Sequence, residues 1–553
     1  MFIARSRLAL VAVCAWAAWL VVPSSAWAWK PKTHVHLAEV ARDDALDGKL
    51  TIFATNYASG TLQRDTANNP VVLGTYNVHP AVLAALRDHP AQFRAGVLGP
   101  DAYPDIATGQ QIIHPAGVQG NGETNRDIND DGPGPDPWLR HLWNLAYGAN
   151  GTPDSTGPCR AFVAGFATHA AGDIYGHTLI NHYTGDAFHF LPKPENAIKH
   201  LVVEGHVGKM TKNPVYDAQI AGGVSEFIYR NMVEARPNSA VAALLTGKNK
   251  NLSVPVLFAT IRARLQTDID NYNNDLADFD RRIARANFAQ KIALEAEKAA
   301  YRTANGLQTT YKEHWVEDID NGLKAWPQLS HDIALALFFN PADKADLDAA
   351  KARFDRYTND HLLSMLGAPD FVGASRAVVG RWIDAVLNAI GIPAIKEAYQ
   401  ALKTSLYDFV LKSTFGLTTA DLKKYLDDPT TQFDPVMTNP AFFTEGGTQI
   451  TRANFDAQEL KLNGATVFEY ENVPAAYNTV VLTKMLMMEP SEVNRLMHDL
   501  GTSLNLSQPS AILGFAGTLD GSNQWSVNDQ KMIAAQDVAA YRKIFLRQSG
   551  EKP

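Results

Sequence analysis

Apolar residues recur at intervals of three and four along most of this chain, a spacing typical of helices that bury one face. The longest example covers about 256–303, where Ile261, Leu265, Ile269, Tyr272, Leu276, Phe279 and Ile283 follow one another. Alternating patterns are rare, and only residues 467–470 predict a short strand. The sequence therefore predicts a mainly α fold, with helices over 34–50, 158–183, 256–303, 330–340, 343–366, 374–390, 394–414, 419–426, 475–488, 490–500 and 528–547, and loops over 104–136 and 428–465.

Composition excludes several classes of protein. With 553 residues, 46% of them hydrophobic, the chain can bury a large core and is too apolar to be disordered. Its two cysteines, Cys14 and Cys159, exclude a disulfide-stapled scaffold and a four-cysteine zinc module. The formal net charge of −8 argues against broad electrostatic binding of nucleic acid.

The first 28 residues have the pattern of a secretory signal peptide. Arg5 and Arg7 precede an apolar run over 8–22, and the small residues Ala26 and Ala28 form the expected cleavage signal, with cleavage after Ala28. Cleavage would leave Trp29 with a free α-amine, in a protein that is secreted or periplasmic. The alternative is an uncleaved membrane anchor. No later segment has the 18 or so uninterrupted apolar residues of a membrane span, so no transmembrane anchor is expected in the mature chain.

Histidines concentrate in one part of the chain, because 12 of the 16 lie between His34 and His206. Three potential metal ligands, His169, Asp173 and His177, are spaced four apart on one predicted helix, so their side chains share one stripe. Imidazole and carboxylate are the usual zinc ligands where thiolates are lacking, and a central carboxylate can bridge two metals. The alternative is a polar stripe with ordinary buried histidines.

Three further groups could complete such a site. His200 and Glu204 lie one turn apart on a helix expected near 195–209. The amine and carbonyl of a processed Trp29 could chelate a metal together with His34, although a frayed end with a surface histidine is the alternative. Asp101 follows the turn Gly99-Pro100, and His114 comes after it. Simple turn chemistry is the alternative for the aspartates of this loop.

In chain order these candidates resemble the pattern of the zinc-dependent phospholipase C family and its relatives, the single-strand-specific zinc nucleases. The resemblance covers about 29–210. Only three residues separate Asp173 from His177. With this short gap, the sequence motif most resembles that of the glycosylphosphatidylinositol-specific phospholipase D branch of that superfamily. His141 and His182 stay alternative ligands. The matching residues are Trp29, His34, Asp101, His114, His169, Asp173, His177, His200 and Glu204.

The resemblance implies a multi-helix phospholipase C/nuclease-like catalytic domain over 29–340 that holds three zinc ions, with a mostly helical C-terminal region of unknown role over 341–553. Asp101 would act as catalytic base or extra ligand beside the bridging water. The implied ligand sets are His114, His169 and Asp173 for the first ion; His177, His200 and Glu204 for the second; and Trp29, His34 and a bridging Asp173 for the third.

One loop resembles the opening of a calcium-binding loop, with Asp127, Asn129 and Asp131 at alternate positions before Gly132. The twelfth position is Trp138 rather than glutamate, so the motif is incomplete. Calcium is therefore possible here, and a turn with solvated acidic side chains is the alternative.

The expected function is that of a secreted zinc-dependent phosphodiesterase, a hydrolase of the phospholipase C type that attacks phospholipids with a metal-activated water. Its expected partners are the phospholipid substrate and, transiently, a membrane surface, with no stable nucleic-acid complex. A single-strand nuclease or nucleotidase on the same scaffold is the alternative enzyme. A non-catalytic exported zinc-binding protein is the alternative from another class.

Overall fold

The computed structural model describes a little over half of the chain. The segment 1–28, His114, the possible calcium loop over 127–132 and the helices expected within 343–414 and 528–547 lie outside the described residues. The described residues are 29–55, 62–105, 108–109, 113, 135–148, 154–185, 194–215, 217–236, 239–245, 254–338, 424–425, 427–489, 491–493, 495–496 and 499.

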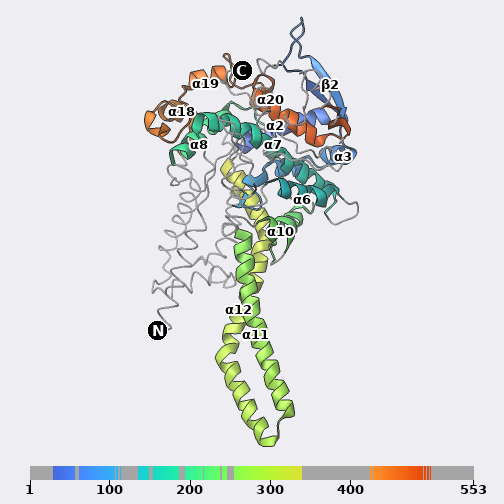
Figure 1. The fold of residues 1–553 in the computed structure, drawn as a ribbon, viewed down its shortest axis with the longest axis vertical. Helices are drawn as coiled ribbons and strands as arrows, with labels where there is room; N and C mark the ends of the chain where they lie inside the picture. Colours follow the sequence, from blue (N-terminus) through green and yellow to red (C-terminus); the bar gives the residue numbers. More distant parts are fainter. Residues whose placement is uncertain are drawn as a thin grey trace, which may run out of the picture.

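The described part is mainly helical, with one two-stranded sheet, so the predicted fold class is confirmed (Figure 1). None of the described helices is long and apolar enough to cross a membrane. In chain order the elements are α2 (Pro31–Ala45), β1 (Lys49–Phe53), β2 (Val72–Asn77), α3 (Pro80–Asp88), α4 (Pro90–Val97), η1 (Gly99–Asp101), α6 (Pro135–Tyr147), α7 (Gly157–Thr184), α8 (Pro194–Met210), α9 (Val224–Ile228), η3 (Tyr229–Val233), α10 (Ala240–Leu244), α11 (Val254–Arg285), α12 (Phe288–Phe338), α18 (Pro429–Met437), η8 (Pro440–Phe443), α19 (Arg452–Gln458), η9 (Tyr470–Asn472) and α20 (Pro474–Met487).

Helix α7 is the centre of the fold. It begins and ends within one residue of the predicted helix 158–183. Nearly all of its described side chains are buried, including the small alanines that let neighbouring helices approach closely. Helices α2, α3, α4, α6, α8 and α20 all pack against it. Side chains projecting from α7 are therefore shielded from water on several sides.

Three secondary-structure predictions were wrong. The helix expected over 34–50 ends at Ala45, and Leu50 lies in β1, which pairs antiparallel with β2. Residues 467–470 form no strand, because the backbone N–H of Phe468 donates to the carbonyl of Met210 at the end of α8 (3.0 Å) rather than to a neighbouring strand. The loop expected over 428–465 contains α18, η8 and α19.

The long helix expected over 256–303 is two helices, α11 and α12, that form an antiparallel hairpin. Asn287 breaks the run because it caps α12. Its Oδ1 accepts from the backbone N–H of Gln290 (3.0 Å), and Gln290 Oε1 accepts from the backbone N–H of Asn287 (3.1 Å). This reciprocal pair is a capping box, which fixes where the second helix begins.

Described segments beyond residue 340 share the core of the N-terminal half. Helix α20 packs on α2 and α7, and α18 packs on α8. The ammonium of Lys484 on α20 donates to the carbonyl of Thr51 (2.7 Å) and pairs with Asp44 (2.8 Å). The indole N–H of Trp29 donates to Thr479 Oγ1 (3.4 Å). The division expected at residue 340 stays a prediction, but residues 429–487 are part of the surroundings of α7.

The α11–α12 hairpin projects away from the other described helices (Figure 1). Near the body, α12 reaches the loop that follows η1, where His331 Nδ1 lies 2.6 Å from the hydroxyl of Tyr103. Along the hairpin the helices are joined by an apolar seam that includes Leu265 and Ile269, and by ion pairs such as Arg262 with Asp320.

Candidate metal centre

The three spaced residues of α7 lie on one buried face, as predicted. Asp173 is central, since its Oδ2 lies 3.1 Å from His169 Nε2 and its Oδ1 lies 3.8 Å from His177 Nε2. All three side chains are fully buried. The two oxygens of the Asp173 carboxylate thus face different histidines. In this geometry each oxygen could coordinate a different metal ion.

His34 brings a third histidine to Asp173 from the start of α2. Its Nε2 lies 3.2 Å from Asp173 Oδ1, and its ring stacks on that of His169 with centroids 3.9 Å apart. Gly172 makes this approach possible, because a Cβ there would lie 2.5 Å from His34 Nδ1. His34, His169 and Asp173 form one buried group whose donor atoms lie within 4.8 Å of one another, and this group could hold a metal ion.

A backbone carbonyl determines which ring nitrogen of His169 carries the hydrogen. Its Nδ1 lies 2.8 Å from the carbonyl oxygen of Val97, which can only accept, so Nδ1 bears the hydrogen. Burial lowers the pKa of His169, so the ring is neutral at neutral pH and Nε2 offers a lone pair toward Asp173. Metal-binding histidines are commonly oriented by such a bond.

Asp101 reaches the same centre from η1. Its carboxylate is buried, and its Oδ2 lies 4.0 Å from His169 Nε2. Gly99 has φ +50, and a Cβ there would lie 2.4 Å from the His169 ring. The turn can therefore press against His169 only with glycine at this position, and that contact sets Asp101 beside the histidine.

His200 and Glu204 project from α8 toward the α7 stripe. Both are buried, and the rings of His177 and His200 lie with centroids 5.7 Å apart. The hydroxyl of Thr184 gives its hydrogen to the carbonyl of Gly185 (3.0 Å), so it accepts from His200 Nδ1 (3.4 Å). Burial lowers the pKa of His200 to about 3. Its Nε2 therefore offers a lone pair, as that of His169 does.

Glu204 gives the clearest sign that the site needs a cation. Both carboxylate oxygens are buried and have no hydrogen-bond partner among the described residues. Burial raises the pKa of Glu204 well above its usual value; the charge of Lys30 opposes this shift, and the nearby charges of Asp101 and Asp173 add to it. Burial likewise raises the pKa of Asp173. Three carboxyls placed this close must keep protons or bind a cation, and neutral imidazoles with lone pairs are ligands for a cation.

Lys30 is a member of these surroundings that sequence reasoning missed. A Cβ on Gly205 would lie 3.3 Å from Lys30 Nζ, which places the ammonium beside the α8 turn that carries Glu204. Burial lowers the pKa of Lys30 to about 8, although the negative charge of Glu204 acts to raise this pKa. Its only sequence signal was its place next to Trp29.

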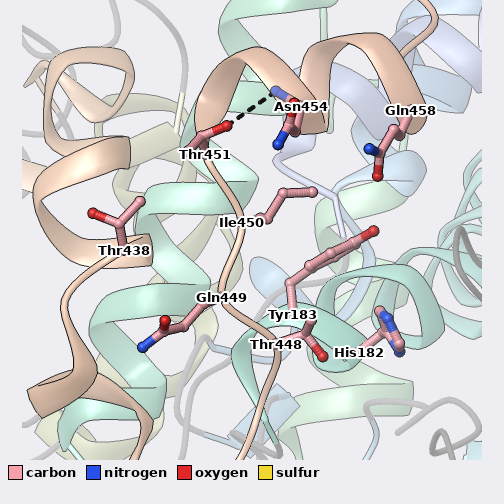
Figure 2. A pocket seen from close by; sticks show the side chains of 9 residues that line it. All are labelled: His182, Tyr183, Thr438, Thr448, Gln449, Ile450, Thr451, Asn454 and Gln458. Carbon is pink, nitrogen blue, oxygen red and sulfur yellow. Dashed lines mark hydrogen bonds between the residues drawn. The ribbon is translucent and has the colours of Figure 1, made fainter.

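The remaining predicted ligands have other surroundings or lie outside the described residues. The side chain of Trp29 lies beside Gly172, and its role as a ligand through the amine stays a prediction. His141 is half-buried on α6. His182 lines a hollow of about 560 Å³. Figure 2 shows its side chain on α7, with Thr451, Asn454 and Gln458 of the α19 region on the other side of the hollow. His114 lies outside the described residues.

The chain was compared with protein-family models, with curated proteins and with solved structures, and no match was found in any of the three. The arrangement of its own residues is therefore what identifies this site as a candidate metal centre.

Proposed function

We propose that this protein is an exported zinc-dependent phosphodiesterase that hydrolyses phospholipids in the manner of a phospholipase C. The observation that carries the proposal is the buried group around Asp173, in which imidazole nitrogens and carboxylate oxygens converge without a thiolate. Such a donor set suits zinc better than calcium or magnesium, which prefer oxygen ligands alone. The order of the same residues along the chain resembles the zinc-dependent phospholipase C family and supports the same conclusion.

We further propose that more than one ion binds, up to the three that the resemblance implies. The support is that Asp173 faces His34 and His177 with one oxygen and His169 with the other. A second donor set, His177 with His200 and Glu204, lies along the same stripe. Bound zinc would lower the pKa of a water molecule to near neutrality and neutralise charge on phosphoryl oxygens.

The residues of the chain have distinct parts in this proposal. The carbonyl of Val97 and the hydroxyl of Thr184 hold His169 and His200 with their Nε2 lone pairs toward the site. Asp101, whose Oδ2 lies 4.0 Å from His169 Nε2, would accept a proton from the attacking water. The burial of all these groups strengthens their interactions with a phosphate.

Metal analysis of the processed protein, with hydrolysis assays on phosphatidylcholine and single-stranded DNA, tests the proposal. We expect bound zinc, release of the phosphorylated headgroup, and loss of at least about 100-fold in zinc affinity and activity for Asp173→Asn. Glu459→Gln is the matched control, because it alters a buried carboxylate that accepts from the Tyr183 hydroxyl (2.5 Å) outside the donor group.

The outcomes separate the alternatives. Zinc binding with cleavage of DNA alone would identify a nuclease, and zinc binding without hydrolysis of either substrate would favour a non-catalytic zinc protein. Equal zinc content in the parent and in Asp173→Asn would refute the donor group. A variant that blocks cleavage after Ala28 and keeps its full zinc content and activity would refute the role of the Trp29 amine.

A further inference from the structure

The far end of the α11–α12 hairpin lies well away from the other described helices (Figure 1). Helix α11 has 32 residues and so spans about 48 Å, and Figure 1 shows that the hairpin holds its turn far from the other described helices. We define the hairpin tip as residues 281–292, which include this turn. The outer part of the hairpin therefore holds the tip away from the core.

The hairpin tip is an ordered structure. The capping box of Asn287 and Gln290 fixes the start of α12. Just behind the tip, the rings of Phe279 and Tyr301 lie with centroids 5.6 Å apart, and Lys298 pairs with Asp280 across the two helices. The exposure of side chains at the tip is therefore set by well-packed helices.

Two large apolar side chains face solvent at the hairpin tip. Phe288 is 80% exposed and Ile292 is 60% exposed, and their spacing of four places them on one face of α12. Phe288 is the most exposed large apolar side chain in the described part of the chain. Placing both in water is costly, by about 25 cal/mol for each Å² of apolar surface, unless they have another environment to enter.

The hairpin tip is also locally basic. Its twelve residues include Arg281, Arg282, Arg285 and Lys291 and no acidic residue, although the whole chain has a net charge of −8. Arg281 lies 3.2 Å from Asp278, and Arg282 lies 3.6 Å from Glu297, both just outside the tip.

Two of these cations stand apart from such pairs. Arg285 and Lys291 form no ion pair among the described residues. Their charges therefore remain available to an anionic partner beside Phe288 and Ile292.

We infer that the hairpin tip docks onto a bilayer surface that contains anionic phospholipids. Phe288 and Ile292 would enter the boundary between headgroups and acyl chains, while Arg285 and Lys291 would contact the anionic headgroups. A stable protein partner would need an interface of about 1,000 Å² or more, which the turn between two helices is too small and convex to offer. This inference goes beyond the proposed function and does not depend on the metal centre.

Co-sedimentation of the full chain with vesicles tests the inference. We expect binding to phosphatidylcholine vesicles that contain 30% phosphatidylglycerol as probe composition, and much weaker binding to pure phosphatidylcholine. Arg285→Gln with Lys291→Gln should lower the affinity roughly 30-fold, and added salt should weaken parent binding. Phe288→Ser with Ile292→Ser should lower it at least about tenfold.

Matched controls come from the stem of the same hairpin. Leu307→Ser removes an apolar side chain that is 66% exposed, and Arg264→Gln with Arg302→Gln removes two exposed cations. These variants should bind like the parent, and circular dichroism should show equal helix content in all. Parent-like binding by both tip variants would overturn the inference, as would failure of the parent to prefer anionic vesicles. Binding of the tip to polyglutamate but not to vesicles would also overturn it, in favour of an acidic protein partner.

Discussion

The metal centre and the hairpin place ionisable side chains in opposite surroundings. Around Asp173 the carboxylates and imidazoles are fully buried, and each depends on a neighbour for its protonation and orientation. Along the hairpin, pairs such as Arg281 with Asp278 are more than half exposed. Buried groups cannot exchange a lost partner for water, whereas exposed groups can. Equivalent substitutions should therefore have large effects at the centre and small ones on the hairpin.

The largest contrast should come from one substitution made in both regions. Gly172→Ala would place a Cβ 2.5 Å from the His34 ring, so we expect about 1–3 kcal/mol of destabilisation and loss of most metal affinity. At Gly306 on α12 the nearest atom is the Tyr272 hydroxyl at 3.2 Å, so Gly306→Ala should be neutral or stabilise by up to about 1 kcal/mol. Denaturant unfolding and zinc titration measure both. Equal effects of the two substitutions would break the contrast.

A smaller effect is expected from the residue that orients His200. Thr184→Val keeps the shape of the side chain but removes the oxygen that accepts from His200 Nδ1. Zinc affinity should fall about 10–100-fold, because the ring is then free to present the wrong nitrogen. Thr310→Val on the hairpin removes a hydroxyl that donates to the carbonyl of Gly306, and should leave zinc affinity unchanged. Equal zinc affinity in Thr184→Val and the parent would show that Thr184 does not orient His200.

The pH dependence of stability should distinguish metal-free from metal-loaded protein. Burial raises the pKa of Asp173 and Glu204, so the metal-free folded state keeps protons that the unfolded state releases above about pH 4.5. Folding then becomes less favourable as pH rises, by up to about 1.4 kcal/mol per pH unit for each such group.

Comparison of the metal-free with the metal-loaded protein near neutral pH isolates this effect. Histidines with a lowered pKa, such as His200 at about 3, and Lys30, whose pKa is lowered to about 8, also make stability depend on pH, but they do so in both forms. Unfolding with and without a chelator should therefore show a more negative slope of stability against pH in the metal-free protein. Equal slopes in the two forms would contradict the buried-carboxyl account.

The smallest effect is expected on the hairpin surface. Arg281→Ala removes an exposed ion pair with Asp278, so the free energy of unfolding should change by less than about 0.5 kcal/mol. Thermal unfolding measures it. A loss of 2 kcal/mol or more would mean that hairpin charges are as dependent on their partners as those of the centre.

Sequence periodicity predicted the elements that depend on local pattern. The helix spanning Asp173 was placed within one residue at each end, and its spacing put three ligands on one face because helical geometry leaves no freedom there. The turn at Asn287 was missed although Asn and Gln at that spacing are a capping-box signature. The strand β1 was missed because the helix was extended to Leu50, although the buried residues Leu50 and Ile52 alternate with more exposed ones as in a strand.

Tertiary contacts could not be read from the sequence. That Thr184 orients His200 depends on how α7 and α8 pack, and no spacing rule links residues of two helices. The position of Lys30 beside Glu204 and the packing of α20 on α7 likewise depend on contacts between segments that are distant in the sequence. His182 was kept as an alternative ligand to His177, but five residues turn a helix by about 500°, so it points to another side of α7.

The most direct test of the central claim is anomalous scattering at the zinc absorption edge from crystals of the processed protein. The account predicts an anomalous peak about 2.0–2.2 Å from ligand atoms of His34, His169 and Asp173, with further peaks along the stripe toward His200 and Glu204. Zinc-containing crystals with no peak at these residues, or with peaks only at surface histidines, would contradict it.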